Sequence, residues 1–394
     1  MQVGYGGGSV TGRPGTEVVR NLGELPGISA QERDELSAVM RVYEFRVSRH
    51  YASLIDWSDP NDPLRRIVLP APDEIDEQLD FDPSDERANS PVPSLQHKYR
   101  RTALVLVSDV CAAYCRFCFR KRFTLATSHQ EHITIADGQR RETSVDPREA
   151  IAYIAAHPEI DNVLVTGGDP LLLSARRLRT LGLELAAIPH VRTIRFGTKV
   201  PAFDPERIDG EMIDALAAPL AEGVGVHVMA HFTHPRELTD ISRTATCDLG
   251  RAGLAVFNQT PLLHGINDDE ATLASLFGTL SEWGVTPYYL LHCRPTRGNE
   301  KFLVTVADGA RLVHDVRLRL NGLAKTFRYV LSHSTGKLEI VGVTDGVLVL
   351  RYHQAKCAED HDRVVLLPLD ETLDWPSEEL LEQKPVAVAE RDGS

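Results

Sequence analysis

The sequence predicts an α/β protein whose centre is a partial (β/α)6 barrel, and two patterns support this prediction. Short apolar segments alternate along the middle of the chain with longer amphipathic ones, which is typical of parallel strands covered by helices. Six such units are too few to close the eight-stranded form of this barrel. The strands are predicted at residues 103–107, 162–165, 193–196, 224–228, 255–259 and 287–291, and the helices at 146–157, 174–188, 209–220, 235–251 and 268–283.

The flanking segments divide the chain further. We expect the glycine-rich residues 1–28 to be disordered, and residues 29–95 to form an extension that is helical at first and then irregular and rich in Pro and Asp. The barrel is predicted over 96–325, with its last helix at 311–320. Residues 326–370 predict a small C-terminal β lobe, and 371–394 a peripheral tail. Strands of the lobe are predicted at 327–331, 338–343, 347–352 and 364–367, with Thr344-Asp345-Gly346 as a hairpin turn.

The composition restricts the class of protein. Hydrophobic residues make up 42% and charged residues 25% of the 394 positions, which is ordinary for a soluble globular protein. No segment has the ~20 apolar residues of a membrane helix, and the N-terminus lacks a secretory signal, so we expect a cytoplasmic protein without membrane contact. A net charge of −13 argues against nucleic acid as a partner. Basic residues nevertheless cluster at 98–101 and 116–122, which predicts a pocket for phosphate or carboxylate.

Three cysteines, Cys111, Cys115 and Cys118, follow the first predicted strand with the spacing C-x3-C-x2-C. Thiolates are the usual ligands of a [4Fe–4S] cluster. Three of them would leave the fourth iron open, so that a substrate could bind there and be reduced. A zinc site completed by His129 or His132 is an alternative. Disulfides are not expected, because 6 cysteines in 394 residues are sparse and their clustering does not suit bridges.

The second predicted strand ends in Gly167-Gly168-Asp169. Glycines there allow the backbone to approach a ligand closely and to expose N–H groups to it, although a tight turn between strand and helix is an alternative interpretation. Together with the three cysteines, this segment resembles the radical S-adenosylmethionine (SAM) superfamily. The resemblance implies a radical SAM barrel, with the cysteines holding the cluster and residues 167–169 contacting the methionine amino group of SAM.

Further segments are similar to the lysine 2,3-aminomutase family, in order and with matching spacing from about residue 95 to residue 340. They are Lys98-Tyr99, the core Cys-Arg-Phe-Cys-Phe-Arg at 115–120, residues 194–201, 231–239 and 258–268, and Tyr288-Tyr289. Members of this family use pyridoxal 5′-phosphate (PLP) beside SAM and the cluster, and PLP requires a Schiff-base lysine and a phosphate site.

The resemblance implies roles for four residues around PLP. Lys337, in Ser334-Thr335-Gly336-Lys337, lies where the family has its Schiff-base lysine, but only Gly336 remains of the glycine run before it; an exposed hairpin lysine is the alternative interpretation. Lys98 and Tyr99 match the pair that contacts the phosphate, with lysine replacing an arginine and losing its bidentate geometry. Gln259 matches a glutamine near the ring, although a buried amide without this role is equally ordinary.

The substrate residues depart from the lysine-specific pattern. Arg120 matches the arginine that binds the substrate α-carboxylate, a pairing that guanidinium geometry favours. Lysine-specific members hold the distal ammonium with two aspartates. The first position is Arg294 in this chain, and the second falls near Val330 and Leu331, where no acid occurs. A cation at this place repels a lysine side chain. We therefore expect an acidic substrate, glutamate or aspartate.

The leading hypothesis is a PLP-dependent amino acid 2,3-aminomutase, an isomerase that moves an amino group from C2 to C3 by radical chemistry. The resemblance implies a small amino acid substrate, an external electron donor of the flavodoxin or ferredoxin type, and a homo-oligomer. Three alternatives stay open. They are a radical SAM enzyme without PLP, an aminomutase that modifies a protein lysine, and a zinc-stabilised binding protein without catalysis.

Overall fold

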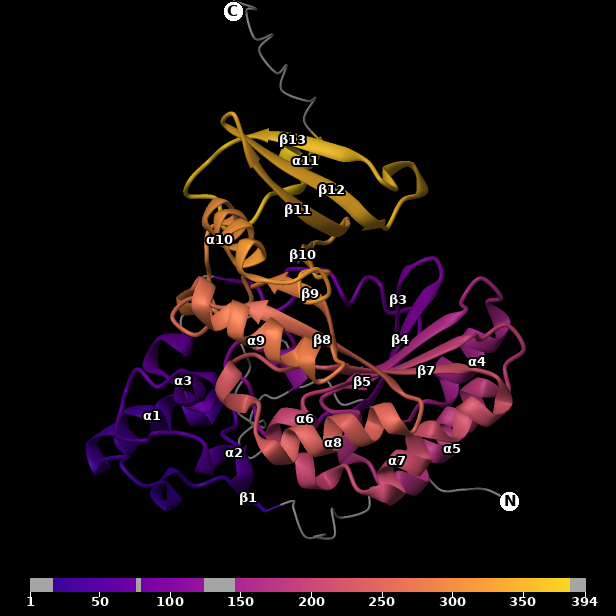
Figure 1. Cartoon of the computed structure of the whole chain (residues 1–394), viewed down its shortest axis with the longest axis horizontal. Coiled ribbons are helices and arrows are strands. Elements are labelled where there is room, and N and C mark those ends of the chain that lie inside the picture. Colours follow the sequence, from indigo (N-terminus) through magenta and orange to yellow (C-terminus); the bar gives the residue numbers. More distant parts are fainter. Residues whose placement is uncertain (1–16, 76–78, 124–145, 383–394) are drawn as a thin grey trace, which may run out of the picture.

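The computed structural model describes residues 17–75, 79–123 and 146–382. In this part of the chain one sheet of eleven strands runs in the order β13-β12-β11-β10-β9-β8-β7-β6-β5-β4-β3 (Figure 1). Strands β4 to β10 are parallel to one another, whereas β3 and β11 to β13 pair antiparallel. The parallel strands are β4 Thr102–Ser108, β5 Asn162–Gly167, β6 Thr193–Thr198, β7 Gly225–Ala230, β8 Ala255–Leu262, β9 Thr286–His292 and β10 Arg328–Ser332.

All six predicted barrel strands are present as β4 to β9, which confirms the α/β class and the parallel sheet. The β10 strand, expected to begin a separate lobe, is instead a seventh parallel strand. It pairs with β9, with Arg328 beside Tyr289 and Val330 beside Leu291. The C-terminal strands therefore continue the barrel sheet. They are β11 Gly336–Thr344, β12 Val347–Ala355 and β13 Val364–Pro368, while β3 Leu95–Tyr99 forms the opposite edge.

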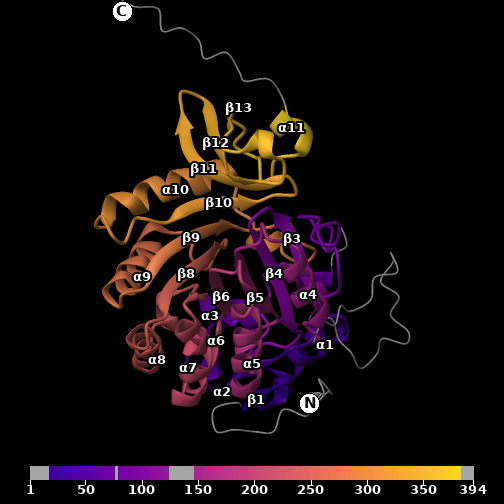
Figure 2. The ribbon, with the colours of Figure 1, turned by 90° about the vertical axis from the view of Figure 1, so that its right-hand side faces the viewer.

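Helices follow the strands as predicted and cover the outside of the sheet (Figure 2). Several of them begin where a short polar side chain accepts a backbone hydrogen bond from the first turn, as Ser174 does for α5 and Thr239 for α8. The predicted helix at 235–251 begins only at Asp240, because residues 235–237 form a separate 3-10 turn. The bounds are α4 Arg148–Ala156, α5 Ala175–Ala186, α6 Val200–Phe203, α7 Gly210–Ala217, α8 Asp240–Arg251, α9 Glu270–Glu282, α10 Val306–Arg319 and α11 Glu378–Glu382.

The N-terminal extension is more structured than the sequence predicts. Residues 17–28, for which no fixed structure was expected, contain a short strand and a 3-10 turn, because Val19, Leu22 and Leu25 are apolar and become buried. The helix expected over the following residues is interrupted at 43–48. The elements are β1 Val18–Val19, α1 Ala30–Val42, β2 Val47–Ser48, α2 Arg49–Ser53 and α3 Pro63–Val68.

Short 3-10 turns connect these elements. Two of them carry residues that matter below: η2 Pro72–Ile75 in the extension and η3 Lys121–Phe123 after the cysteines. The others are η1 Leu22–Glu24, η4 Pro170–Leu172, η5 Pro205–Arg207, η6 Ala218–Glu222, η7 Pro235–Glu237, η8 Glu300–Phe302 and η9 Ala358–Asp360. The predicted hairpin turn joins β11 to β12, and Asp345 and Gly346 both adopt the positive φ that such a turn requires.

Two large apolar clusters, and a small third one around Tyr43 and Phe81, stabilise the described part of the chain. The larger one fills the space between the sheet and its outer helices. In the second, the N-terminal extension packs on Ala112 and Ala113, so it covers the loop that carries the three cysteines. Figures 1 and 2 place β11 to β13 at the end of the molecule away from α1 to α3. Within the described residues, no helix is both long and apolar enough to cross a membrane.

The first and last parts of the barrel meet across its open side. Lys98 Nζ on β3 donates a hydrogen bond to the carbonyl oxygen of His333, which follows β10. Close by, Ser84 Oγ donates to the carbonyl oxygen of Ser332 at 2.8 Å. An exposed ion pair between Lys356 and Asp85, 3.8 Å apart, lies at the same junction. These contacts close the barrel laterally around the cavity described next.

Candidate active site

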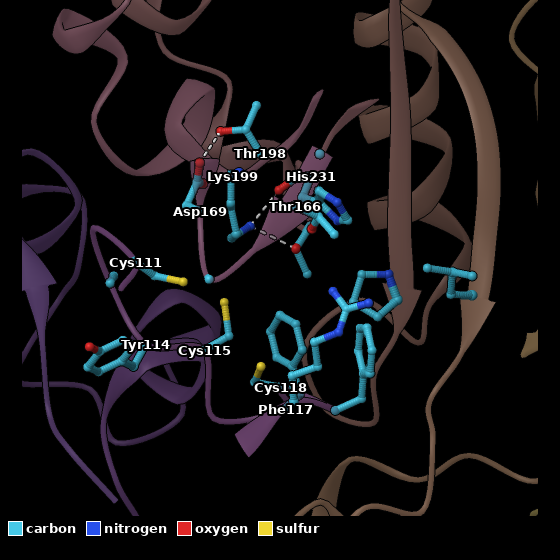
Figure 3. A pocket seen from close by; sticks show the side chains of 18 of the residues that line it. Cys111, Tyr114, Cys115, Phe117, Cys118, Thr166, Asp169, Thr198, Lys199 and His231 are labelled. Carbon is cyan, nitrogen blue, oxygen red and sulfur yellow. Dashed lines mark hydrogen bonds between the residues drawn. The ribbon is translucent and has the colours of Figure 1, made fainter. Parts of the chain in front are cut away.

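Cys111, Cys115 and Cys118 lie in the loop after β4, at the C-terminal ends of the parallel strands. Their side chains line one cavity, here called the outer cavity, together with the loops that follow β5, β6, β7 and β9. Figure 3 shows the three sulfur atoms facing the same space, opposite the loop of Asp169. Burial raises the pKa of Cys115 to about 12, so the metal-free thiol is not a reactive nucleophile at neutral pH.

The three thiols have the chemistry and the number that a [4Fe–4S] cluster with one open iron requires. Among the described residues, no three His, Cys, Asp or Glu side chains are close enough to bind one metal ion together. Ligands of a cubane can lie farther apart, because each sulfur binds a different iron. His129 and His132, the candidate zinc ligands, lie outside the described residues, so the zinc alternative is not decided by geometry.

The cysteine loop is anchored by a buried carboxylate that sequence analysis missed. Glu74, in η2 of the N-terminal extension, is fully buried and accepts hydrogen bonds from Arg116 Nε at 3.0 Å and NH2 at 2.7 Å. Lys121 Nζ lies 3.6 Å from the same carboxylate. Although burial opposes ionisation, Arg116 and Lys121 hold the pKa of Glu74 at about 2. The carboxylate therefore stays charged and ties the loop to the extension.

We expect Glu74→Gln to destabilise the fold by about 3–5 kcal/mol, because it leaves two buried cations without their anion. Urea unfolding monitored by circular dichroism measures this change. The matched control is Asp73→Asn, since Asp73 is exposed and pairs only at the surface with Lys301, 3.1 Å away; it is expected to cost less than about 1 kcal/mol. Equal stability of the two variants would contradict the anchoring role of Glu74.

The Gly-Gly turn packs directly against the start of the cysteine loop. A Cβ at Gly167 would lie 2.3 Å from the Ser108 carbonyl oxygen, and one at Gly168 would lie 2.6 Å from the backbone of Val110. The N–H groups of Gly168 and Asp169 donate to the carbonyls of Ser108 and Val110. The expectation that these N–H groups face a ligand is therefore wrong, because the adjacent loop uses them. An ammonium group requires acceptors, and backbone carbonyls can provide these at such a turn.

Asp169 lines the outer cavity, but its carboxylate serves to join two loops. It accepts a hydrogen bond from Thr198 Oγ1 at 2.7 Å (Figure 3), and further ones from Lys199 N at 2.7 Å and Leu171 N at 3.1 Å. The Lys199 amine in turn donates to the His231 carbonyl oxygen at 2.7 Å and to Glu237, and so fixes the next strand end. Sequence analysis assigned no role to Lys199 or His231.

A second, inner cavity adjoins the outer one inside the barrel. All four residues expected around PLP line it: Lys98 and Tyr99 from β3, Gln259 from β8 and Lys337 from β11. The two cavities share a boundary, because several residues line both. These shared residues are Phe119, Arg120, Thr166, Gly197, His231, Leu291, Arg294 and Ser332.

The two lysine amines of the inner cavity, Lys98 and Lys337, have pKa values close to neutral pH. The Lys337 amine lies 4.2 Å from the centre of the Tyr289 ring, so Lys337 is not the exposed hairpin lysine of the alternative interpretation. Burial, together with Arg195 and Arg294, lowers the pKa of Lys337 to about 7. Burial and Arg294 do the same for Lys98. A lysine that is partly neutral at pH 7 is suited to form a Schiff base.

Arg120 and Arg294 are brought together at the boundary of the two cavities. Both guanidinium groups lie on the ring of Phe119, with their central carbons 4.7 and 3.9 Å from its centre. Glu86, from the connector before β3, lies between them. Its Oε1 is 3.3 Å from Arg120 NH2 and 3.7 Å from Arg294 NH1. Neither Glu86 nor Phe119 was among the candidate residues from the sequence.

Glu86 is also bound by Arg122, whose NH2 donates to Oε2 at 2.6 Å. Although burial opposes ionisation, Arg120, Arg122 and Arg294 hold the pKa of Glu86 far below its usual range. The basic run at 116–122 was expected to form an anion pocket. This expectation is wrong for Arg116 and Arg122, whose side chains bind carboxylates of the chain itself. Arg120 alone of the four basic residues in this run lines both cavities.

The second acidic position of the lysine-specific pattern stays apolar in the structure. Val330 and Leu331 are fully buried in β10, and Val330 pairs with Leu291, which lines both cavities. Among the described residues that line the inner cavity, Glu86 is the one carboxylate, against three arginines and two lysines. These basic residues are Arg120, Arg195 and Arg294, and Lys98 and Lys337. An excess of positive charge in a cavity favours anionic ligands.

Comparisons with known proteins agree with this geometry. Residues 105–276 match the radical SAM superfamily. The chain is 42% identical over 351 residues to a protein of Aquifex aeolicus (strain VF5) provisionally named L-lysine 2,3-aminomutase, and the match covers 88% of this chain and 91% of the relative. This chain belongs to the lysine 2,3-aminomutase family. The resemblance found in the sequence is thus confirmed.

Other members of the lysine 2,3-aminomutase family differ in the substrate that their names give. The chain is 33% identical over 284 residues to the L-lysine 2,3-aminomutase of Escherichia coli (strain K12), covering 72% of this chain and 78% of that one. It is 32% identical over 307 residues to the glutamate 2,3-aminomutase of Clostridioides difficile (strain 630), covering 78% and 69%. Membership implies a radical SAM enzyme of the aminomutase type, with SAM and a [4Fe–4S] cluster.

Proposed function

We propose that the protein is a PLP-dependent 2,3-aminomutase whose substrate is an acidic amino acid, glutamate or aspartate. The observation that carries this proposal is the pair of arginines, Arg120 and Arg294, at the boundary of two adjoining cavities. One cavity contains three thiols and the other a half-buried lysine, Lys337, with a pKa of about 7. A substrate at the boundary would be within reach of SAM in the outer cavity and of PLP in the inner cavity.

The residues fit the groups that the proposal requires. Cys111, Cys115 and Cys118 would hold the cluster, and residues 167–169 would offer backbone carbonyls to the amino group of SAM. In the inner cavity, Lys337 would attach PLP, and Lys98 and Tyr99 would bind its phosphate. The cationic excess of this cavity suits a phosphate dianion, which would also favour the charged form of Lys98.

In the proposed mechanism, the bound cofactors supply a 5′-deoxyadenosyl radical and a π system that delocalises the unpaired electron. The chain itself binds and orients. Arg120 would hold the α-carboxylate and Arg294 the side-chain carboxylate, so that the β-hydrogen faces the outer cavity. Burial and the nearby Lys199 lower the pKa of His231 to about 3, so this side chain stays neutral at the boundary. The enclosing barrel would exclude water from the radicals.

Anaerobic turnover with SAM, PLP, dithionite and a panel of amino acids tests the proposed function. Glutamate should give 3-aminopentanedioate, detected by mass spectrometry after derivatisation. A 1,2-shift in aspartate returns aspartate, because both central carbons carry a carboxyl group, so aspartate must be labelled at C2 and analysed for label at C3. Conversion of lysine without conversion of either acid would contradict the proposal.

The attachment of PLP should depend on pH in a way that Lys337 determines. Only the neutral amine attacks PLP, so the rate should rise as pH increases from about 6 to 8 and level off above the lowered pKa of about 7. An ordinary lysine would level off only near 10.4. Borohydride reduction at a series of pH values, followed by peptide mass spectrometry, measures the rate at Lys337. The control is Lys325, a lysine that lines neither cavity.

A further inference from the structure

Glu86 couples the two arginines that the proposed function assigns to the substrate. A single oxygen atom, Oε1, lies 3.3 Å from Arg120 NH2 and 3.7 Å from Arg294 NH1. The other oxygen, Oε2, accepts from Arg122 and from Arg120 Nε. Glu86 is 8% exposed and comes from the connector, outside the barrel that carries the arginines. Glu86 therefore reaches the two arginines from a different segment of the chain.

Without Glu86 the arginines would repel one another. Three guanidinium groups surround its carboxylate, and two of them also lie close to the ring of Phe119. Like charges that are this close and partly desolvated are held together only by an anion between them. Glu86 therefore determines the distance between the guanidinium groups of Arg120 and Arg294.

The two arginines differ in how much of their hydrogen-bonding capacity the chain uses. Arg120 donates to Glu86 and, at 3.5 Å, to Gln96 Oε1. In the described part of the chain, the Arg294 guanidinium makes no hydrogen bond; its contacts are the longer ion pair to Glu86 and the ring of Phe119. Arg294 thus has donors to offer a ligand carboxylate, close to the place where Arg120 would bind a second carboxylate.

We propose that Glu86 is a positioning residue that selects the length of the substrate by fixing the spacing of Arg120 and Arg294. Because one carboxylate oxygen reaches both guanidinium groups, the spacing is short and suits a four- or five-carbon dicarboxylate, not a six-carbon one. This inference rests on the proposed use of the two arginines as carboxylate sites. It adds chain length to charge as a basis of specificity.

The test measures the binding of unreactive diacids to the holoenzyme by isothermal titration calorimetry at low chloride. Succinate, glutarate and adipate differ only in length. In the unsubstituted protein, we compare adipate with whichever of succinate and glutarate binds better. The better of these two should have a dissociation constant at least about tenfold below that of adipate. In Glu86→Gln the arginines are no longer held, and this ratio should fall below about threefold. Asp73→Asn removes an exposed carboxylate that pairs with Lys301 and lines neither cavity, so it should keep the ratio of the unsubstituted protein.

A ratio measured on one preparation is insensitive to partial loss of folded protein, which separates positioning from stability. Should Glu86→Gln not fold, Glu86→Asp retains the charge on a shorter side chain and should change the order of the three diacids. Equal binding of adipate and glutarate by the unsubstituted protein would overturn the inference, as would an unchanged ratio in both Glu86 variants. Length-selective binding of diacids without turnover of any acidic amino acid would contradict the proposed function alone.

Discussion

Cys115→Ser is expected to abolish reductive cleavage of SAM, with a loss of at least about a thousandfold in the rate of 5′-deoxyadenosine formation. Cys115 is the central one of the three thiols that line the outer cavity. A serine hydroxyl does not ionise near neutral pH and is a poor ligand for iron, so a cluster with two remaining thiolates would be lost or would no longer present an open iron. Anaerobic incubation with SAM and dithionite, followed by chromatography of 5′-deoxyadenosine, measures the rate, and iron and sulfide analysis measures the cluster.

Cys247→Ser provides the matched control. Cys247 lies on α8 and its sulfur contacts the Trp283 carbonyl oxygen, on the outside of the barrel and away from both cavities. This variant should retain iron, sulfide and SAM cleavage within about twofold. Full SAM cleavage by Cys115→Ser would refute the assignment of the cluster to this loop. Zinc without iron in the unsubstituted protein would favour the zinc-stabilised alternative instead.

The barrel strands were predictable because they are buried on both faces. A segment such as Val105 to Val107 is apolar without interruption, and such runs between amphipathic helices are typical of the parallel strands of an α/β protein. β10 has the same kind of apolar sequence, but sequence alone does not say which strand is its neighbour. Its pairing with β9 depends on the whole barrel, and for this reason the sequence pattern places it in a separate lobe.

Sequence analysis predicted the site residues that belong to a local motif. It did not predict the ion pairs between residues that are far apart in the sequence. The three cysteines were found from their spacing, and Lys337 was found from the resemblance to the family. Glu74 and Glu86 lie in an irregular acidic connector, where neither differs from its neighbours in sequence. One signal was available in the sequence. Several basic residues in a loop next to an apolar strand indicate that carboxylates elsewhere in the chain pair with them if the loop is buried. The sequence does not identify which carboxylates these are, because pairing is set by tertiary structure.

Arg294→Asp is expected to change the preference of the substrate site from an acidic to a basic side chain. The substitution removes the guanidinium with free donors and places a carboxylate near Arg120 and the ring of Phe119. An acidic side chain would then meet a like charge, and we expect the kcat/KM for glutamate to fall by at least about a hundredfold. A cationic side chain would find an anion at this place, so binding of lysine should become detectable. Competition assays with glutamate and lysine, in the presence of SAM and PLP, measure both effects.

The charge exchange distinguishes recognition from a general defect. Loss of Arg294 also removes one of the three cations around Glu86, so some loss of activity is expected for any substitution there. Arg294→Gln, which is neutral, should therefore lower glutamate turnover without admitting lysine. Arg251→Asp is the surface control, because Arg251 is exposed on α8 and forms an ion pair with Asp248 at the surface. If Arg294→Asp and Arg294→Gln lose glutamate turnover equally and neither binds lysine, Arg294 acts on the packing of Phe119 and not on the charge of the substrate.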